Sequence, residues 1–281
     1  MDLSAYLARI GLAAAPPASA QGLAALQSAH RRSIGFENLD VLLGRAIRID
    51  GEAVFDKLVR RGRGGYCFEQ NRLFADALHV LGFAVRPLLA RVRLGQAWEA
   101  PVPRSHVLLL VEIAGEAWIV DAGFGGALTP PLCLRDGASA LTPDGARHRL
   151  RHIGAPGSLI GEWLLERAGP PEATDGRAGD ATGWVAQYGF DLAQVCADDL
   201  EQVNHWTSTR AGTRFLTTQV ASIVLDTGFA ALTDTRLTLY REGRTERREI
   251  EGAQDLRETL AGTFRIDLPE ADLARLPVFV G

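Results

Sequence analysis

The spacing of hydrophobic residues changes along the chain, and the first change lies near Gly82. Before it, apolar positions recur every three to four residues, which predicts amphipathic helices. The clearest helix runs from Phe68 to Leu81, and Gly82 provides its C-terminal stop. Similar spacing predicts earlier helices over Leu3–Ile10, over Leu23–Ile34 and, after Asp50 as the N-cap, through Val59.

After Gly82 the apolar segments become short and rich in Val, Leu and Ile, which is typical of strands. The predicted strands are Val85–Val92, Ser105–Ile113, Ala117–Val120, Arg147–Ile153, Gly161–Glu166 and Trp184–Phe190. The stretch Ala168–Gly183 is rich in Gly, Pro, Ala and Asp, and it predicts a long exposed loop. We therefore expect the middle third to be a β-rich barrel or sheet.

A mixed pattern of helices and strands begins near Cys196. Its predicted helices are Asp198–Val203, Asp255–Leu260 and Glu270–Leu276, and its predicted strands are Phe215–Leu225, Thr235–Glu242 and Thr245–Ile250. The whole pattern predicts an α+β protein in three parts, residues 1–82, 83–195 and 196–281.

The composition is that of a globular protein, with 281 residues, 47% apolar and 23% charged. The 34 acidic and 30 basic residues give a net charge of −4, which argues against nucleic-acid and anionic-membrane partners. The N-terminus lacks a basic stretch before an apolar run, and no apolar run approaches the roughly 20 residues that span a bilayer. We therefore expect a cytoplasmic location. Lys57 is the only lysine, which we attribute to codon bias.

Three cysteines do not make a disulfide framework, and without a CxxC pair they predict no metal site. Cys67 stands out because a glycine-rich turn over residues 62–65 precedes it and a helix follows. Unpaired N–H groups at a helix start favour the thiolate, the reactive form of cysteine. This pattern alone leaves a nucleophile and a buried structural cysteine both open. Cys133 and Cys196 have no candidate base nearby in sequence, and we interpret both as packing residues.

A cysteine nucleophile needs a base, and the base needs an orienting group. His106 begins one apolar strand and Asp121 ends the next. The segment Ala114–Glu116 predicts a hairpin turn, and antiparallel pairing would place both side chains at one edge of the sheet. Local spacing does not show whether Cys67 comes near this edge. His30, beside two arginines, is expected on the surface.

Three separated motifs, in the same order, resemble those of the arylamine N-acetyltransferase family. They are the cysteine motif Arg63–Asn71, the histidine motif Pro103–His106 and the aspartate motif Val120–Gly125. A fourth segment, Phe36–Leu39, is similar to an early loop of the family. The resemblance extends over the whole chain, and the ordered set is more specific than any single motif.

The resemblance implies a catalytic triad of Cys67, His106 and Asp121. It also implies an N-terminal helical domain, a central β-barrel and a C-terminal α/β lid, around a catalytic core that resembles those of cysteine proteases and transglutaminases. The reaction implied is ping-pong transfer of an acetyl group from acetyl-CoA, the acyl donor, to arylamines and arylhydrazines. The intermediate would be an acetyl-cysteine, and no metal is implied.

The resemblance further assigns residues around the triad. Four apolar side chains would line the acceptor pocket: Phe36, Val92, Phe124 and, from the lid, Phe215. Three glycines would let the backbone approach CoA or substrate closely: Gly123, Gly125 and Gly126. Ordinary core packing remains the alternative for each aromatic residue.

Other functions stay open beside this one. An amide synthase of the same fold would acylate an amine from a carrier-bound acyl chain, without CoA. A cysteine hydrolase or transglutaminase would take peptides or glutamine amides instead of CoA esters. A non-enzymatic binding protein could keep the fold, although the intact set of three residues argues against it. The oligomeric state is also open, including a homo-oligomer.

Overall fold

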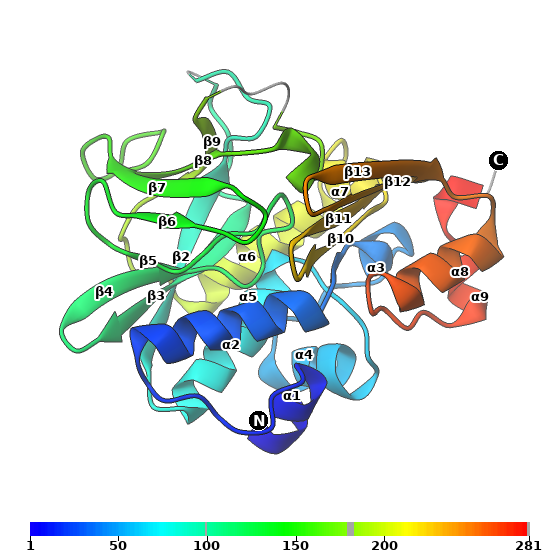
Figure 1. Ribbon diagram of the computed structural model, residues 1–281, viewed down its shortest axis with the longest axis horizontal. Helices are drawn as coiled ribbons and strands as arrows, with labels where there is room; N and C mark the ends of the chain where they lie inside the picture. Colours follow the sequence, from blue (N-terminus) through cyan, green and yellow to red (C-terminus); the bar gives the residue numbers. More distant parts are fainter. Residues whose placement is uncertain (99, 179–182, 280–281) are drawn as a thin grey trace.

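The computed structural model describes residues 1–98, 100–178 and 183–279, and Figure 1 shows how their elements are arranged. The N-terminal segment is mainly helical, as its spacing predicted. Its helices are α1 (Leu3–Arg9), α2 (Ala20–Ser33), α3 (Leu39–Leu42), α4 (Gly51–Phe55), a π-helical turn (Asp56–Arg60) and α5 (Cys67–Val80). The side chain of Asp50 caps α4 by accepting the N–H of Ala53, which confirms the predicted N-cap.

The middle of the chain forms an eight-stranded antiparallel sheet in the order β5-β4-β3-β2-β9-β8-β7-β6. The two edge strands are linked by the short segment 134–138, and the sheet curls into a nearly closed barrel (Figure 1). The strands are β2 (Ala84–Val92), β3 (His106–Ile113), β4 (Glu116–Val120), β5 (Leu132–Cys133), β6 (Ser139–Leu141), β7 (Arg147–His152), β8 (Trp163–Ala168) and β9 (Val185–Phe190).

Strand β3 is buried on both faces, which explains its uninterrupted apolar run. Leu108 and Leu110 point into the core of the barrel. Leu109 and Val111 alternate with them and pack in the N-terminal core, which also contains Phe74 of α5. Helix α5 therefore lies against the outside of the barrel, and this packing positions the first residue of the helix.

The C-terminal segment contributes a second antiparallel sheet, in the order β1-β10-β11-β12-β13. Its elements are β10 (Val220–Leu225), β11 (Gly228–Thr233), β12 (Arg236–Arg241) and β13 (Arg244–Glu249), with α6 (Ala197–Thr209), α7 (Arg214–Thr217), α8 (Ala253–Gly262), α9 (Glu270–Leu273) and a 3-10 turn (Pro277–Phe279). The first strand, β1 (Phe36–Glu37), comes from the N-terminal segment and pairs Phe36 with Ser222.

In this segment one prediction is wrong and one strand was not predicted. The sequence predicts one strand over Phe215–Leu225, but its first residues belong to α7. The side-chain amide of Asn38 donates to the carbonyls of Phe215 (2.9 Å) and Thr218 (2.8 Å) and so stabilises the helical turn α7. Local spacing cannot show this contact, because Asn38 is distant in sequence. No strand is predicted over Gly228–Thr233, where β11 lies, because its glycine and two alanines give little strand signal.

The predicted loop Ala168–Gly183 is described except for residues 179–182, which lie outside the described residues. It contains a 3-10 turn (Pro171–Ala173) and a bridge between Thr174 and Ala127. The N–H of Asp175 donates to the carbonyl of Gly126 (2.9 Å). The loop is therefore attached to the glycine-rich segment that follows Asp121.

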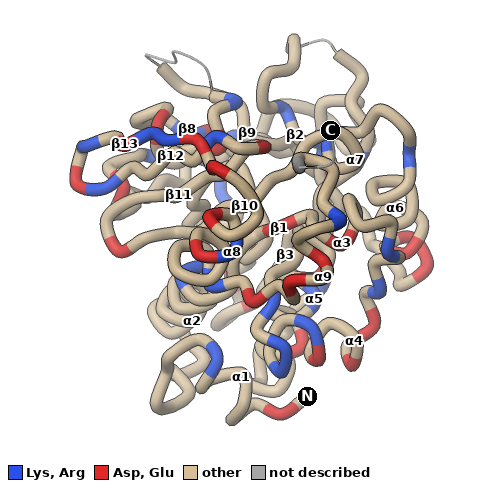
Figure 2. The backbone as a smooth tube through the Cα atoms, turned by 90° about the vertical axis from the view of Figure 1, so that its right-hand side faces the viewer, with Lys and Arg blue, Asp and Glu red and all other residues tan. Residues whose placement is uncertain are grey.

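Basic and acidic residues are interspersed along the chain (Figure 2). In residues 1–98, 100–178 and 183–279 there is no helix with the length and apolarity needed to cross a membrane. The same residues hold no group of three or more His, Cys, Asp and Glu side chains placed to share a metal ion.

Candidate active site

The hairpin between β3 and β4 brings His106 and Asp121 together. Its two turn residues, Ala114 and Gly115, have φ values of 52° and 82°, as expected for a tight turn that keeps the strands in register. The ladder ends at the Leu109–Val120 pair, so Asp121 lies just beyond β4. From there its Oδ2 is 2.7 Å from Nε2 of His106. The predicted proximity of the two side chains at the sheet edge is confirmed.

The His106–Asp121 pair is ionised. Burial lowers the pKa of His106, but the charge of Asp121, its hydrogen bond and the contact with Cys67 outweigh burial and raise that pKa to about 10. Burial raises the pKa of Asp121, but His106 and hydrogen bonds from Asn71 and the Gly123 N–H lower it overall. At neutral pH the pair is therefore an imidazolium and a carboxylate, both about 2% exposed.

Cys67 is the first residue of α5 and reaches the same place. Tyr66 is the N-cap, and its N–H donates to Oε2 of Glu69 (3.0 Å), which is the glutamate half of a capping box. Sγ of Cys67 lies 3.9 Å from the carbonyl oxygen of Ser105, the residue before His106, and Cys67 and His106 line the same cavity. Cys67 is also among the groups that raise the pKa of His106. The fold thus brings together the three side chains that the sequence places in separate motifs.

Asn71, one turn after Cys67, ties these elements to one another. Its Nδ2 donates to the carbonyl of Val107 (2.7 Å) and to Oδ1 of Asp121 (3.1 Å). Its Oδ1 accepts the N–H of Ala122 (2.9 Å). One amide side chain therefore fixes α5 against both β3 and the segment that carries Asp121.

The glycines after Asp121 are needed for close packing. A Cβ on Gly123 would lie 2.8 Å from Cα of Cys67, and one on Gly125 would lie 2.7 Å from the ring of Phe36. A Cβ on Gly126 would lie 2.7 Å from a methyl group of Leu94. These glycines let the segment lie directly against the nucleophile and the aromatic wall.

Helix α2 supplies polar contacts that the sequence analysis missed. Gln27 accepts the N–H of Asp121 (3.2 Å), and Arg31, 1% exposed, donates to the carbonyls of Ala122 (3.3 Å) and Phe124 (2.6 Å). His30 is fully buried, so its predicted surface position is wrong. Gln27 and His30 lie one turn after Leu23 and Leu26, on the apolar face of the predicted helix. Polar residues in such positions could have indicated buried polar contacts.

Tyr188 of β9 is a second neighbour of the site that sequence did not single out. Its ring centroid lies 5.1 Å from that of His106 and 5.1 Å from that of Phe124, and Tyr188 is fully buried. The ring centroids of His106 and Phe124 are 5.3 Å apart. These aromatic contacts keep water from one side of the imidazole.

A cavity of about 530 Å³ opens beside Cys67 and His106. Its wall includes the four apolar side chains assigned to the acceptor pocket: Phe36, Val92, Phe124 and Phe215. Gly123 and Gly125 also line it, whereas Gly126 does not. Charged side chains line the wall as well, from the loop after β8, from the C-cap of α6 and from α7: Asp175, Arg177, Arg210 and Arg214.

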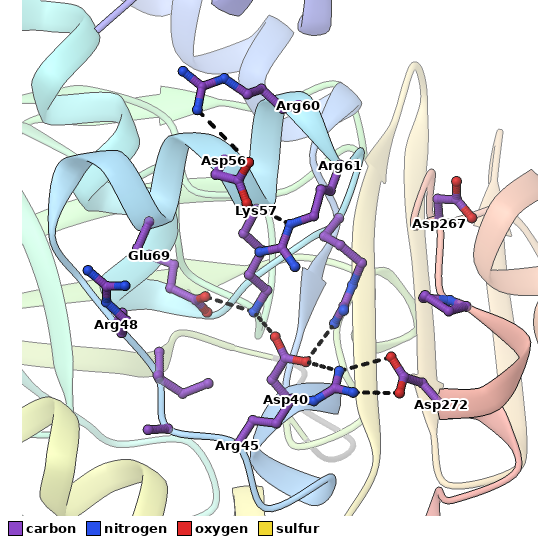
Figure 3. A pocket seen from close by; sticks show the side chains of 15 residues that line it. Asp40, Arg45, Arg48, Asp56, Lys57, Arg60, Arg61, Glu69, Asp267 and Asp272 are labelled. Atoms are coloured by element: carbon purple, nitrogen blue, oxygen red, sulfur yellow. Dashed lines mark hydrogen bonds and ion pairs between the residues drawn. The ribbon is translucent and has the colours of Figure 1, made fainter.

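A second, polar cavity of about 720 Å³ adjoins a buried charge cluster around Lys57 (Figure 3). Lys57 Nζ lies 2.7 Å from Oε1 of Glu69 and 2.7 Å from Oδ2 of Asp40. Burial lowers the pKa of Lys57, but the charges of Glu69, Glu37 and Asp40 raise it overall. The attribution of this lysine to codon bias was incomplete, because Lys57 holds the carboxylate that caps α5.

Comparison with known proteins places the chain in a family. An N-acetyltransferase family model matches residues 19–273. An arylamine N-acetyltransferase of Mycolicibacterium smegmatis is 36% identical over 98% of this chain and 94% of its own length. This chain belongs to the arylamine N-acetyltransferase family.

Solved structures of family members share the whole fold. The arylamine N-acetyltransferase of Salmonella typhimurium superposes with a TM-score of 0.87 at 34% identity, over 99% of this chain and 98% of that one. The Mycobacterium marinum arylamine N-acetyltransferase, solved in complex with CoA, gives a TM-score of 0.85 at 33% identity, over 98% of both chains. The α+β fold and the predicted family are confirmed.

Proposed function

We propose that this protein transfers an acetyl group from acetyl-CoA to an arylamine or arylhydrazine through an acetyl-cysteine on Cys67. The observation that carries the proposal is the buried chain Cys67–His106–Asp121 at the wall of an apolar cavity. The family relatives, among them one solved with CoA, support CoA as the donor rather than a carrier-bound acyl chain.

In the first half-reaction the Cys67 thiolate attacks the thioester carbonyl and forms a new S–C bond. The tetrahedral intermediate collapses by breaking the bond to the CoA sulfur, which leaves with a proton from the His106 imidazolium. In the second half-reaction the amine nitrogen attacks the acetyl-cysteine and gives its proton to His106. Cys67 then leaves as the thiolate, and the amide is released.

Asp121 orients His106 throughout and stabilises its charged form. Its hydrogen bond occupies Nε2 of the imidazole, so Nδ1 is the nitrogen left to exchange a proton with Cys67 and the substrates. The N–H of Cys67, at the first turn of α5, is unpaired within the helix and is the proposed donor to the tetrahedral oxyanion.

The acceptor would bind against Phe36, Val92, Phe124 and Phe215. The rings of Phe36 and Phe215 are 6.0 Å apart, and Phe215 also contacts Tyr66. An aromatic amine can stack in such a pocket while the apolar wall keeps water from the acetyl-cysteine. Cys67, Cys133 and Cys196 are all free thiols, which suits a reducing compartment such as the cytoplasm.

Initial rates of CoA release, with acetyl-CoA and an arylamine varied together, test this proposal. A ping-pong mechanism predicts parallel double-reciprocal lines, and Cys67→Ala should release no CoA while keeping its circular dichroism spectrum. Cys196→Ala, which removes an exposed cysteine, is the matched control and should keep full activity. Intersecting lines, or turnover by Cys67→Ala, would contradict the proposal. Faster transfer from an acyl carrier protein than from acetyl-CoA would instead favour the amide synthase.

A further inference from the structure

The cavity beside Cys67 carries an unbalanced charge on its outer wall. Among the described residues that line it, three are arginines, Arg177, Arg210 and Arg214, and one is an acidic residue, Asp175. The side chains of Arg177 and Arg214 are each 29% exposed, whereas that of His106 is 3% exposed. The cluster therefore lies nearer the solvent than the reacting groups do.

Asp175 satisfies only part of this charge. Its Oδ2 accepts Nε of Arg177 (2.6 Å), and its Oδ1 accepts the N–H of Arg177 (3.2 Å), so both oxygens already bond to that residue. Nη2 of Arg214 is 3.9 Å from the same Oδ2, too far for a hydrogen bond, and it has no hydrogen-bond partner in the described part of the chain although it is buried. Burial and the nearby charge of Arg177 lower the pKa of Arg214. The geometry thus leaves a cationic donor without an acceptor.

The two arginines are held by different parts of the fold. Arg177 lies two residues after Asp175, whose N–H donates to the carbonyl of Gly126. Arg214 begins α7 and is next to Phe215, which lines the cavity. A ligand that bridges Arg177 and Arg214 would therefore connect the loop after β8 to the C-terminal segment across the cavity.

We propose that Arg177 and Arg214, with Arg210 beside them, bind the phosphate groups of the CoA donor. This inference rests on the proposed function, which requires a polyanionic donor to lie with its thioester at Cys67. Three guanidiniums and one carboxylate give a net charge near +2, which matches a pyrophosphate, and planar guanidiniums are the side chains best suited to bind it. The partly exposed position suits phosphates that keep some of their water, whereas a carboxylate on a small acceptor would lie deeper.

The test compares two thioester donors that transfer the same acetyl group. Acetyl-CoA carries phosphates, and N,S-diacetylcysteamine carries none. In a ping-pong mechanism kcat/KM for a donor reports the acylation of Cys67 alone. For Arg177→Gln/Arg214→Gln we expect kcat/KM for acetyl-CoA to fall by about 10- to 100-fold, since each charge-assisted contact is worth roughly tenfold. The same value for N,S-diacetylcysteamine should stay within about twofold of the wild type.

Two controls complete the design. Arg236→Gln removes an arginine whose side chain is 72% exposed and does not line the cavity. It should leave kcat/KM unchanged for both acetyl-CoA and N,S-diacetylcysteamine. Two acceptors, aniline and 4-aminobenzoate, are compared in the second half-reaction. For both acceptors, kcat/KM of the double variant should match that of the wild type. The acetyl-CoA value should also fall with added salt more steeply for the wild type than for the variant.

Each contrary outcome is distinct. An equal loss with both donors would show that the arginines only support the fold, and a loss confined to 4-aminobenzoate would make them an acceptor site; either result would overturn the inference. If neither donor acetylates the wild-type protein, the proposed function itself fails, and this inference fails with it.

Discussion

Charge and hydrogen bonding at individual residues explain how the site holds its reactive form. Asp121 receives hydrogen bonds from Asn71, from the Gly123 N–H and from His106 (2.7 to 3.1 Å), so a buried carboxylate stays ionised. The motifs around Cys67, His106 and Asp121 could be read from the sequence. The partners in α2 and β9 could not, because no local spacing connects Gln27 or Tyr188 to this sheet edge.

The raised pKa of His106 makes a prediction about stability and pH. The pKa is near 6.5 when unfolded and about 10 when folded, so the stabilisation from the His106–Asp121 pair is complete below about pH 6.5 and is lost as the pH rises to 10. We expect the difference in unfolding free energy between the wild type and Asp121→Asn to shrink over this range, by up to about 1.4 kcal/mol per pH unit. Urea denaturation at several pH values measures it, and a difference that is constant with pH would contradict the ion pair.

Gly123 gives a second prediction at this scale. Gly123→Ala would push a methyl group against the backbone of Cys67, which cannot move aside cheaply. We expect a loss of about 1 to 3 kcal/mol in stability and of about 100-fold in kcat/KM, since the nucleophile is displaced. Gly262→Ala, at a helical position with open space around it, is the matched control and should be neutral or stabilising. Equal activity in the two variants would rule out the packing role.

At the scale of elements, the position of α5 depends on the charge cluster at its start. Glu69 both caps Tyr66 and pairs with Lys57, so a buried lysine is linked to the helix that begins with Cys67. The sequence predicted α5, the β3–β4 hairpin and six of the eight barrel strands, because their periodicity and turn chemistry are local. It did not predict the short strands β5 and β6, which are too short to show a period. It missed α7 and β11, whose conformations are fixed by tertiary contacts and by pairing with distant strands.

Lys57→Met tests the cluster. Removing the cation leaves Glu69 and Asp40 buried without their partner, so we expect a loss of about 3 to 5 kcal/mol in unfolding free energy. Arg48→Met breaks an ion pair whose arginine side chain is 73% exposed, and it should cost at most about 0.5 kcal/mol. Chemical denaturation compares the two. Similar small losses in both variants would show that Lys57 is dispensable for holding α5.

At the scale of the whole molecule, strand pairing, hydrogen bonds and an ion pair join the N-terminal segment to the C-terminal segment. Strand β1 belongs to the C-terminal sheet, and Asn38 bonds to α7 and to the N–H of Val220 (2.9 Å). Arg45 also forms a short ion pair with Asp272 of α9 (2.5 Å). The predicted division into residues 1–82, 83–195 and 196–281 remains a proposal. These contacts all join the first of these parts to the third.

These contacts predict cooperative unfolding. We expect the transitions followed by tryptophan fluorescence and by far-ultraviolet circular dichroism to coincide during urea denaturation. Asn38→Ala should lower the midpoint of both together, because it removes two hydrogen bonds to α7 and its C-cap and leaves the buried N–H of Val220 unpaired. A separate early transition seen by only one probe would show that the C-terminal segment unfolds independently.

The central claim is that Cys67 carries the acetyl group, and intact-protein mass spectrometry tests it most directly. On mixing with acetyl-CoA and no acceptor, we expect the protein to gain about 42 Da, mapped to Cys67 and absent from Cys67→Ala, and we expect this gain to disappear when an arylamine is added. A protein that transfers the acetyl group to an arylamine without ever gaining this mass, or that gains it at another residue, would show that Cys67 does not carry the acetyl group.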